Sequence, residues 1–377
     1  MRAFVLFCFF AVFYAYFGYP LILRTLRSLG IRRFSKPAEN PGLPSMTVIV
    51  TVRNEERVVR EKIENTLALR YSMPVQIIVA SDASDDGTDD AVREYASRGV
   101  ELVRLHQRGG KEHAQRLAVG SARGDVILFT DAKIKLQPDA LERVAEYFRD
   151  ERIGAVSSID RIEGEGSGED MYVRYEMALR AMESDVNSLV GLSGSCFAVR
   201  RDVTADLRVD IPSDFALLLE ARRRGLSGVH APDVVGTYQA VASEEAEFKR
   251  KVRTVLRGMT ALYACREVMN PSRYGMFAWQ VFSHKLCRWL VPWFLAFAAV
   301  SLLTSAKGDA WLELLLVLSF AFVILAAAGF FVPSLRRKRI CKLPLFFLIV
   351  NAGIAVAWFH FLRGRRTVAW NPSDKGR

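Results

Sequence analysis

The chain has little of what would mark a disulfide-linked, zinc-binding or P-loop protein. Its five cysteines among 377 residues show no CxxC spacing and no pairing with histidine, so neither a disulfide framework nor a zinc site is indicated. A calcium loop over residues 82–93 is excluded, because its last position needs a bidentate acid and holds Arg93. The glycines before Lys111 do not form a P-loop, since Leu105 replaces the first required glycine and Glu112 replaces the hydroxyl residue.

Long apolar runs, by contrast, lie at both ends of the chain. Each has about the 20 residues that a helix needs to cross the hydrocarbon core of a membrane. The first run is too long for the apolar part of a signal peptide, has only Arg2 before it and lacks a small-residue cleavage site. We therefore predict one N-terminal and about three C-terminal transmembrane helices. The runs occupy residues 4–23, 289–306, 314–335 and 343–362.

Basic residues beside these runs predict their orientation, because loops rich in lysine and arginine stay in the cytoplasm. The first run is followed directly by Arg24, Arg27, Arg32, Arg33 and Lys36. The middle of the chain is then cytoplasmic, with an external loop at 307–310 and an internal one at 336–339. The run at 343–362 leaves two alternatives: either a basic tail lies outside, or one C-terminal segment is re-entrant or interfacial. The tail carries Arg363, Arg365 and Arg366.

The net charge of +11 raises the question of a nucleic-acid partner. Much of the excess lies beside the apolar runs, where anionic lipid headgroups attract lysine and arginine. We therefore expect a lipid bilayer, and no nucleic acid, as the partner of these basic residues.

Between residues 46 and 265, short apolar runs alternate with segments of helical periodicity. This alternation predicts βαβ units, a mainly parallel sheet and the α/β fold class. Strands are expected at 46–52, 75–80, 100–105, 126–130 and 154–159, with a further short strand ending near Arg201. Helices are expected at 55–69, 88–97, 111–122, 138–148 and 216–224, with a long one after the glycine-rich acidic loop at 163–169.

Acids follow two of these strands at the point where each strand ends. Asp82 comes after the strand at 75–80, and Asp131 comes after the strand at 126–130 with Lys133 two residues later. Because ligands bind at the carboxyl edge of open α/β sheets, both acids are expected at one ligand site. An acid delivered twice to one edge, together with an ammonium, suggests a polyhydroxyl ligand that carries phosphates.

The other candidate residues have plainer structural alternatives. Lys111 is either an anion site at a helix start or a solvated lysine, and the basic segment 250–253 is either a ligand site or a lipid-facing patch. Cys196 has no histidine or asparagine near it in the sequence, so we expect a core thiol. Helix capping is the alternative for five more residues, namely Asp85, Asp86, Thr88, Ser213 and Asp214.

Taken in this order, the motifs resemble glycosyltransferase family 2, in the membrane-bound branch that also contains cellulose and hyaluronan synthases. The resemblance covers residues 45 to about 262 and extends to the layout of the membrane segments. It rests on Val-Ile-Val-Thr-Val-Arg53-Asn54-Glu55-Glu56, Ser81-Asp82, Lys111, Asp131-Ala132-Lys133, the loop 191–201, Ser213-Asp214 and Arg250-Lys251-Val252-Arg253-Thr254.

The resemblance implies a GT-A fold, the Rossmann-like fold of nucleotide-diphospho-sugar transferases, and a role for each motif. Asp214 falls at the position of the general base, a carboxylate that takes a proton in the transition state. The implied donor-binding residues are Thr51, Arg53, Glu55, Asp82, Lys111, Asp131, Lys133, Arg250 and Arg253, of which Lys111, Arg250 and Arg253 would stabilise the leaving diphosphate. The implied acceptor-binding residues are Gly194, Ser195 and Ser213.

The chain departs from the family pattern at three positions. Lys133 replaces the second acid of Asp-x-Asp, the family's usual metal ligand, and an ammonium cannot bind Mg²⁺. Either Asp131 and the phosphates hold a Mg²⁺ or Mn²⁺ ion with water, or Lys133 supplies the positive charge itself. Arg250 and Thr254 replace the Gln and Trp of the family's Gln-x-x-Arg-Trp motif, which disfavours processive polymer synthesis.

We therefore expect an inverting hexosyltransferase of the inner (plasma) membrane with a cytoplasmic catalytic domain. Its donor would be a nucleotide sugar, a UDP-hexose, and its acceptor a lipid-linked or growing cell-surface polysaccharide. Other glycan-assembly proteins would be further partners. Two alternatives remain: transfer to a polyprenyl phosphate, which gives a monosaccharide carrier lipid, and a membrane scaffold of a glycan-assembly complex with weakened catalysis.

The same features divide the chain into expected segments. Two precede the catalytic domain: a membrane anchor at 1–24 and a basic linker at 25–45. The catalytic domain itself spans 46–265. The remaining segments are an amphipathic, interfacial stretch at 266–288, membrane helices at 289–306 and 314–335, a transmembrane or re-entrant segment at 343–362 and a basic tail at 363–377.

Overall fold

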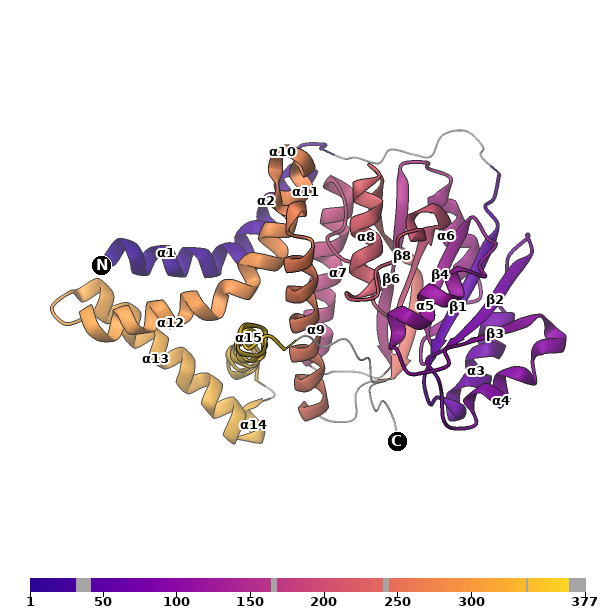
Figure 1. Ribbon diagram of the computed structural model, residues 1–377. Coiled ribbons are helices and arrows are strands. Elements are labelled where there is room, and N and C mark those ends of the chain that lie inside the picture. The colour runs from indigo at the N-terminus through magenta and orange to yellow at the C-terminus, as the bar shows by residue number, and fades with distance from the viewer. Residues whose placement is uncertain (32–41, 164–167, 240–243, 337, 366–377) are drawn as a thin grey trace.

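The computed structural model describes residues 1–31, 42–163, 168–239, 244–336 and 338–365. Parts of the basic linker, the glycine-rich loop and the basic tail therefore lie outside the described residues. Figure 1 shows a sheet with its covering helices at one end of the molecule and a group of long helices at the other.

An eight-stranded mixed sheet with the order β3-β2-β1-β4-β7-β6-β8-β5 forms the centre of the first part. Three neighbouring pairs (β1–β2, β1–β4 and β2–β3) are parallel, as is β6–β8. The strands are β1 (Met46–Val52), β2 (Val75–Ser81), β3 (Val100–Arg104), β4 (Val126–Asp131), β5 (Lys135–Leu136), β6 (Ile153–Glu163), β7 (Cys196–Arg200) and β8 (Ser227–Gln239).

Helices cover both faces of this sheet, which is why its central strands are apolar throughout. Every residue of β1 is buried, as expected for a strand covered on both sides. Val48 and Val50 pack with one layer of helices, and Ile49 between them packs with the other. The first layer is α3 (Glu56–Leu67), α4 (Thr88–Arg93) and α6 (Ala140–Phe148), and the second is α5 (Lys111–Val119) and α8 (Ser213–Arg223).

The expectation of a mainly parallel sheet was wrong for β7 and β5, which pair in antiparallel fashion. Strand β7 is antiparallel to both of its neighbours, β4 and β6. The reason is that the chain returns to the carboxyl edge before β7 begins: the Asp131 backbone N–H donates to the Ser195 carbonyl at 2.9 Å. Strands β5 and β8 were also missed, and α4 ends at Arg93 with a 3₁₀ turn at Ala96–Arg98 in place of a continuous helix to residue 97.

The strand register confirms that the two acids meet at one edge. Thr51 of β1 pairs with Ala80 on one side and with Asp131 on the other. Strands β1, β2 and β4 therefore end side by side, so that the residues after β2 and at the end of β4 share the carboxyl edge.

The second part of the molecule consists of long apolar helices. Four stretches are long and apolar enough to cross a membrane: Arg2–Ser28, Met276–Ser305, Ala310–Phe331 and Arg339–Leu362. The second begins earlier than the predicted start at 289 and takes in part of the stretch expected to be interfacial. The first comprises α1 (Arg2–Phe13), a π-helical turn η1 (Tyr14–Gly18) and α2 (Tyr19–Ser28), and the second comprises α11 (Met276–Val281), a π-helical turn η5 (Phe282–Cys287) and α12 (Arg288–Ser305).

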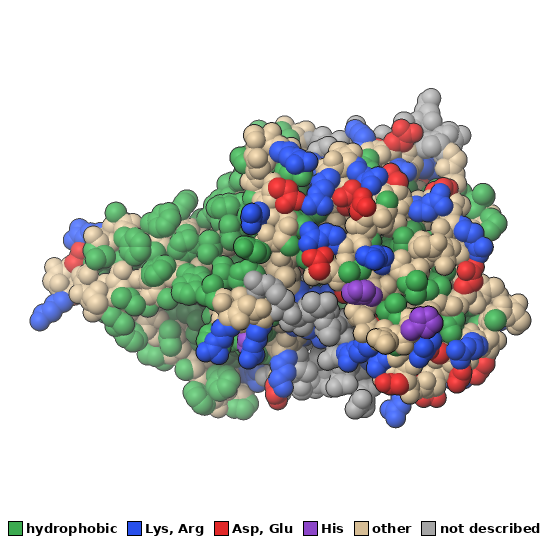
Figure 2. All heavy atoms as spheres, in the orientation of Figure 1, with side chains coloured by type: hydrophobic (Ala, Val, Ile, Leu, Met, Phe, Trp, Pro, Cys, Tyr) green, Lys and Arg blue, Asp and Glu red, His purple; other side chains and the backbone are tan. Residues whose placement is uncertain are grey.

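Exposed apolar side chains distinguish this part from the sheet domain. On α13 (Ala310–Phe331) the side chains of Val317, Ile324 and Phe331 are 63%, 64% and 77% exposed. Figure 2 shows hydrophobic side chains over the end formed by α1, α12 and α13, and charged side chains over the sheet domain. An apolar surface of this extent is covered in soluble proteins, so a lipid bilayer is its natural environment.

Helix α15 (Arg339–Leu362) is oriented differently from the other three. In Figure 1 it is seen nearly end-on, whereas α1, α12 and α13 are seen lengthwise. It packs on the amphipathic helix α9 (Glu244–Ala264), where Lys251 lies over the Phe346 ring and the Tyr263 and Phe361 rings meet edge to face. A short helix, α14 (Pro333–Arg336), precedes it.

A buried polar cluster joins the two parts of the molecule. Helix α7 (Gly168–Val186) presents Glu176 and Glu183 to η5 and to the first residues of α2 and α12. The His284 ring lies between them, with Nδ1 2.7 Å from Glu183 Oε1 and Nε2 3.3 Å from Glu176 Oε2. Arg288 is paired with Glu176, and Tyr19 donates to Glu183 at 2.6 Å. We call these five residues the junction cluster.

The remaining short elements connect these parts. They are η3 (Arg201–Thr204), η4 (Arg266–Met269) and α10 (Pro271–Tyr274). The last two lead from α9 into α11, and Asn270 caps α10 by accepting from the Ser272 backbone N–H at 3.0 Å.

Candidate functional site

Lys111, Asp131 and Gly194 meet at the carboxyl edge of the sheet. Lys111 stands at the start of α5 and is buried, and its ammonium donates to Asp131 Oδ1 at 2.6 Å and to the Gly194 carbonyl at 2.7 Å. The alternative of a solvated lysine was therefore wrong. One ammonium thus connects the end of β4 to the loop 191–195 before β7.

Lys133, two residues beyond Asp131, faces a different carboxylate. Its Nζ lies 3.5 Å from Glu55 Oε2, and Glu55 is 7% exposed. Burial raises the pKa of Glu55, and Lys133 opposes this by lowering it. Beneath the turn, the buried ammonium of Lys62 donates to Thr130 Oγ1 at 3.0 Å and to the Ile134 carbonyl at 2.6 Å. Lys62 therefore fixes both ends of the turn 131–134, from which Lys133 extends.

Asp82 lies at the same edge but binds backbone instead of a cation. Its Oδ1 accepts from the backbone N–H groups of Gly109 and Gly110 at 2.8 and 2.9 Å. Gly110 has a φ of +96°, which favours glycine. Asp82 Oδ2 is buried and has no hydrogen-bond partner among the described residues. An unsatisfied buried carboxylate oxygen is costly, so this atom is suited to a donor from a ligand.

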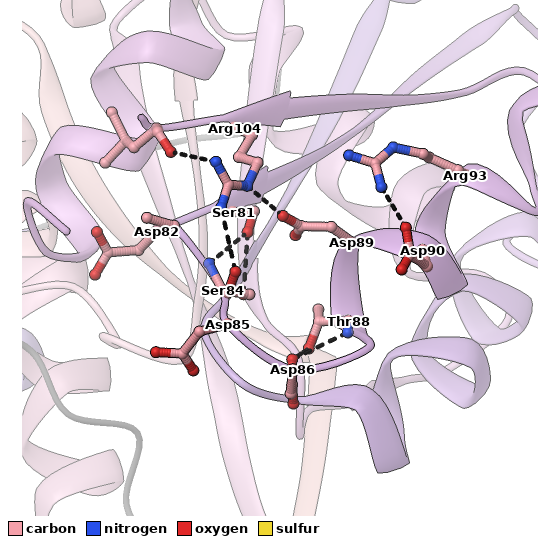
Figure 3. Close-up of polar contacts among 12 residues, drawn as sticks. Ser81, Asp82, Ser84, Asp85, Asp86, Thr88, Asp89, Asp90, Arg93 and Arg104 are labelled. Atoms are coloured by element: carbon pink, nitrogen blue, oxygen red, sulfur yellow. Dashed lines mark hydrogen bonds and ion pairs between the residues drawn. The ribbon is translucent and has the colours of Figure 1, made fainter. Parts of the chain in front are cut away.

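The acidic turn after Asp82 has structural partners, as Figure 3 shows. Asp86 Oδ1 accepts from the Thr88 backbone N–H at 3.0 Å, and Asp89 pairs with Arg104 at 2.5 Å. Asp86 and Thr88 thus stabilise the turn that leads into α4, whose N-cap residue is Gly87 and has no side-chain cap hydrogen bond. Asp85 differs, because its Oδ2 accepts from Arg53 at 2.9 Å.

Arg53 holds the first two strand ends together. It also donates to the Asp82 carbonyl at 2.9 Å and to the Ala83 carbonyl. Asn54 and Ala83 beside it have positive φ angles of 52° and 50°, an uncommon conformation that clusters at ligand sites. The Thr51 side chain is fully buried and accepts from Gln115 at 3.2 Å, so it supports the edge from within.

Asp214 lies beside Gly194 of the loop 191–195. It stands in the first turn of α8, and its Oδ2 lies 3.4 Å from the position that a Cβ on Gly194 would take. A bulkier residue at 194 would press on this carboxylate. Ser213 is 2% exposed and Asp214 is partly exposed, so of the two only Asp214 offers its side chain to the open edge.

The loop is held by Asp160, which the sequence reasoning missed. Ser193 donates to both oxygens of Asp160 at 2.9 and 2.7 Å, and Ser195 donates to one of them at 2.5 Å. Ser195, predicted to bind an acceptor, therefore fixes the loop shape. An acid directly after the predicted strand at 154–159 was the available clue, but nothing in the sequence placed it opposite the serines.

Helix α9 adds arginines at helical spacing. Arg253 is partly buried, and burial together with the neighbouring Arg257 and Arg250 lowers its pKa. Arg257 is paired with the buried Glu112 of α5, next to Lys111. The spacing i, i+3, i+7 puts Arg250, Arg253 and Arg257 on one face of α9. Lys251 contacts Phe346 of the apolar helix α15. The alternative of a lipid-facing basic patch therefore suits Lys251 better than it suits the three arginines.

The residues at the edge do not fit a divalent metal ion. Asp131 is paired with Lys111, and Lys133 occupies the position of the second acid. Across the described part of the chain, no group of three or more His, Cys, Asp or Glu could hold a metal. Cys196 is buried and its pKa is raised to about 12 by burial, so it is the core thiol that the sequence predicted.

Known proteins are similar to this chain both in the sequence of the sheet domain and in the fold. Residues 47–208 match the family model described as glycosyl transferase family 2. A hyaluronan synthase of Streptococcus pyogenes is 26% identical over 203 residues, which are 50% of this chain and 48% of that protein. An N-acetylglucosaminyltransferase of Rhizobium meliloti is 25% identical over 251 residues, 58% of each chain. The chain thus spans about half the length of these curated relatives.

A solved structure extends the likeness to the apolar helices. The mannosyltransferase PcManGT from Pyrobaculum calidifontis, determined with GDP-Man and Mn²⁺, superposes with a TM-score of 0.74 at 22% identity, over 96% of this chain and 99% of that one. At this identity the likeness shows the fold, which is the expected GT-A fold with its membrane helices. The chain thus matches the model of glycosyl transferase family 2 over residues 47–208 and shares the fold of this mannosyltransferase over nearly its whole length.

Proposed function

We propose that the protein is an inverting membrane glycosyltransferase. It transfers the sugar of a UDP-hexose to a lipid-linked or growing cell-surface glycan. The observation that carries the proposal is the three-part contact at the sheet edge. Lys111 joins Asp131 to the Gly194 carbonyl, and Asp214 lies beside the same Gly194. A cation for a leaving diphosphate and a carboxylate for an attacking hydroxyl thus adjoin one residue of the loop 191–195.

Asp214 takes the proton in this mechanism. The acceptor hydroxyl attacks the anomeric carbon of the donor while the bond from that carbon to the diphosphate oxygen breaks, and the configuration inverts. A carboxylate positioned beside the hydroxyl contributes about 10²–10⁴-fold to such a step. Asp82, with one buried oxygen lacking a described partner, holds the nucleoside of the donor.

Cationic side chains stabilise the leaving diphosphate. Lys111 and Lys133 lie at the sheet edge. On α9, burial and the charges of two neighbouring arginines lower the pKa of Arg253, so an anion bound there is favourable. Preorganised charges of this kind act without reorganisation at the moment of reaction. Because Lys133 takes the place of the metal-binding acid, these side chains supply the charge compensation themselves.

The membrane arrangement supports the proposal of a cytoplasmic active site. The basic residues after α2 favour a cytoplasmic location, and Arg27 forms an ion pair with Asp185 of α7 at 2.8 Å. Helix α15, which does not run alongside the other three, would lie in the membrane plane and return the basic tail to the same side.

The test uses the full chain in detergent with a panel of nucleotide sugars, and it measures donor hydrolysis and transfer to membrane lipid extracts. Asp214→Asn should lower transfer by about 10²–10⁴-fold while donor binding is retained. Asp210→Asn is the matched control, because Asp210 is exposed and paired with Arg208 close by in the sequence. Near-normal turnover of Asp214→Asn would remove the assignment of the base, and no turnover of any donor by the unmodified chain would remove the function.

A further inference from the structure

Two cationic side chains that the mechanism does not use converge on Gly191, at the start of the loop 191–195. Arg180 of α7 donates to the Gly191 carbonyl at 3.3 Å and to Ser157 Oγ at 3.5 Å. Lys285 of η5 approaches from the apolar helices, and its Nζ lies 3.3 Å from the position that a Cβ on Gly191 would take. The absence of a side chain at 191 thus leaves space beside the ammonium.

Neither cation has a carboxylate within ion-pair distance in the part of the chain that is described. The acids that α7 presents on this side, Glu176 and Glu183, are engaged by the other members of the junction cluster. Lys285 lies inside the candidate span Met276–Ser305 and is only partly exposed. Charged groups at this depth are costly unless they are paired, and they commonly mark ligand sites.

The position of the two cations argues against a simple contact with lipid headgroups. Lysines that serve this purpose extend outward along the apolar surface, whereas Lys285 points at the backbone of the loop that ends beside Asp214. Gly191 and Gly194 are three residues apart, so their Cα atoms are at most about 11 Å from each other. Arg180 and Lys285 therefore lie at one end of the loop 191–195, and Asp214, the carboxylate assigned as the base, lies near its other end.

We propose that Arg180 and Lys285 bind a phosphate group of a lipid acceptor. This inference rests on the proposed function, whose acceptor it narrows to a lipid that carries a phosphate or diphosphate. Guanidinium and ammonium donors match phosphate oxygens, and the guanidinium fork binds two of them at once. The site lies where a polar loop meets apolar helices, so a ligand with an anionic head and a hydrocarbon tail satisfies both surroundings.

The phosphate has two sources with the same chemistry. In a polyprenyl phosphate, a phosphate oxygen forms the bond to the anomeric carbon as the bond to the nucleoside diphosphate breaks, and no proton has to be removed from a dianionic phosphate. In a lipid-diphosphate-linked glycan, a sugar hydroxyl attacks and its proton passes to Asp214, while the diphosphate stays bound to Arg180 and Lys285. Asp214→Asn separates the two, because only the second needs the base.

Direct binding tests the site without any transfer. The full chain in detergent is mixed with undecaprenyl phosphate, undecaprenol or phosphatidylglycerol, and bound lipid is counted by native mass spectrometry. We expect undecaprenyl phosphate to bind and Lys285→Gln or Arg180→Gln to weaken it about tenfold, the effect of removing one charge-assisted hydrogen bond. Lys285→Arg should restore binding, and Lys307→Gln, an exposed lysine in the α12–α13 loop, should leave it unchanged.

The outcomes separate this inference from the proposed function. Equal binding of undecaprenol, equal binding of phosphatidylglycerol, or no effect of both glutamine variants in chains with an unchanged melting temperature would overturn the phosphate site. Sugar transfer to an acceptor without phosphate would overturn it as well and leave the function standing. Lys285-dependent lipid binding by a chain that transfers no sugar would support the site and remove the function.

Discussion

The sheet edge and the junction cluster both bury charged side chains, yet their charges are balanced differently. In the junction cluster, Glu176 faces Arg288 and His284, and Glu183 faces His284 and Tyr19. Burial raises the pKa of Glu176, but Arg288 and His284 outweigh it and hold that pKa well below its usual range. The two carboxylates of the junction cluster thus each face protein donors, although Glu183 Oε2 accepts no hydrogen bond among the described residues.

At the sheet edge and on α9, several cations lie near one another. Lys111 faces Asp131 and Lys133 faces Glu55, while burial together with the neighbouring Arg257 and Arg250 lowers the pKa of Arg253. Such an arrangement is unfavourable alone and becomes favourable with an anionic ligand. This difference supports the proposal that buried charge at the junction maintains the structure, while charge at the edge binds a phosphorylated ligand.

The largest effect is expected from removing the central cation of the edge. Lys111→Met should lower kcat by about 10²–10³-fold, the usual loss when one preorganised donor to developing charge is removed. Steady-state kinetics with the nucleotide sugar would measure it. Lys135→Met is the control, because Lys135 is an exposed lysine four residues after Asp131. A twofold loss of kcat or less would show that Lys111 has only a structural role, like the residues of the junction cluster.

The junction cluster should respond in stability and not in chemistry. Glu176→Gln leaves Arg288 without its charged partner and should lower the free energy of unfolding by about 3 kcal/mol. Thermal unfolding in detergent measures this, and kcat per folded molecule should be unchanged. Glu245→Gln removes an exposed pair with Lys249 and should leave the free energy of unfolding nearly unchanged. A large fall in kcat for Glu176→Gln at unchanged stability would contradict the division between the two regions.

A smaller effect is expected at the position where a metal-binding acid is replaced. Lys133→Asp puts a carboxylate beside Glu55 and should lower turnover about tenfold without added metal, with Mg²⁺ or Mn²⁺ restoring part of it. Turnover with and without a chelator measures the change, and the unmodified chain should be insensitive to the chelator. Strong inhibition of the unmodified chain by a chelator would contradict the role given to Lys133.

The smallest effect on activity is expected from cysteine substitutions that test the membrane topology, because these should leave turnover unchanged. Arg363→Cys should react with a membrane-impermeant maleimide from the side of the sheet domain, and Lys307→Cys only from the other side. The native cysteines are buried or lie in the apolar helices, so the unmodified chain provides the background. Labelling of both variants from the same side would show that α15 crosses the membrane.

The sequence was sufficient for the parts of this protein that depend on local pattern. Apolar runs of membrane length, the alternation of strands and helices, and the acids Asp82 and Asp131 at strand ends follow from periodicity alone. These residues then met at one edge because parallel strands β1, β2 and β4 end together. The resemblance to glycosyltransferase family 2 likewise implied that Lys133 replaces a metal-binding acid.

Tertiary structure alone decided which charges face each other. Asp160 and Ser195 are 35 residues apart, and Lys285 lies 94 residues beyond Gly191, so neither contact has a local pattern that predicts it. The reversed direction of β7 and the crosswise course of α15 depend in the same way on where the chain returns after a long helix. Local sequence determines which elements form and which side chains end them, whereas long-range packing determines which cations remain available to a ligand.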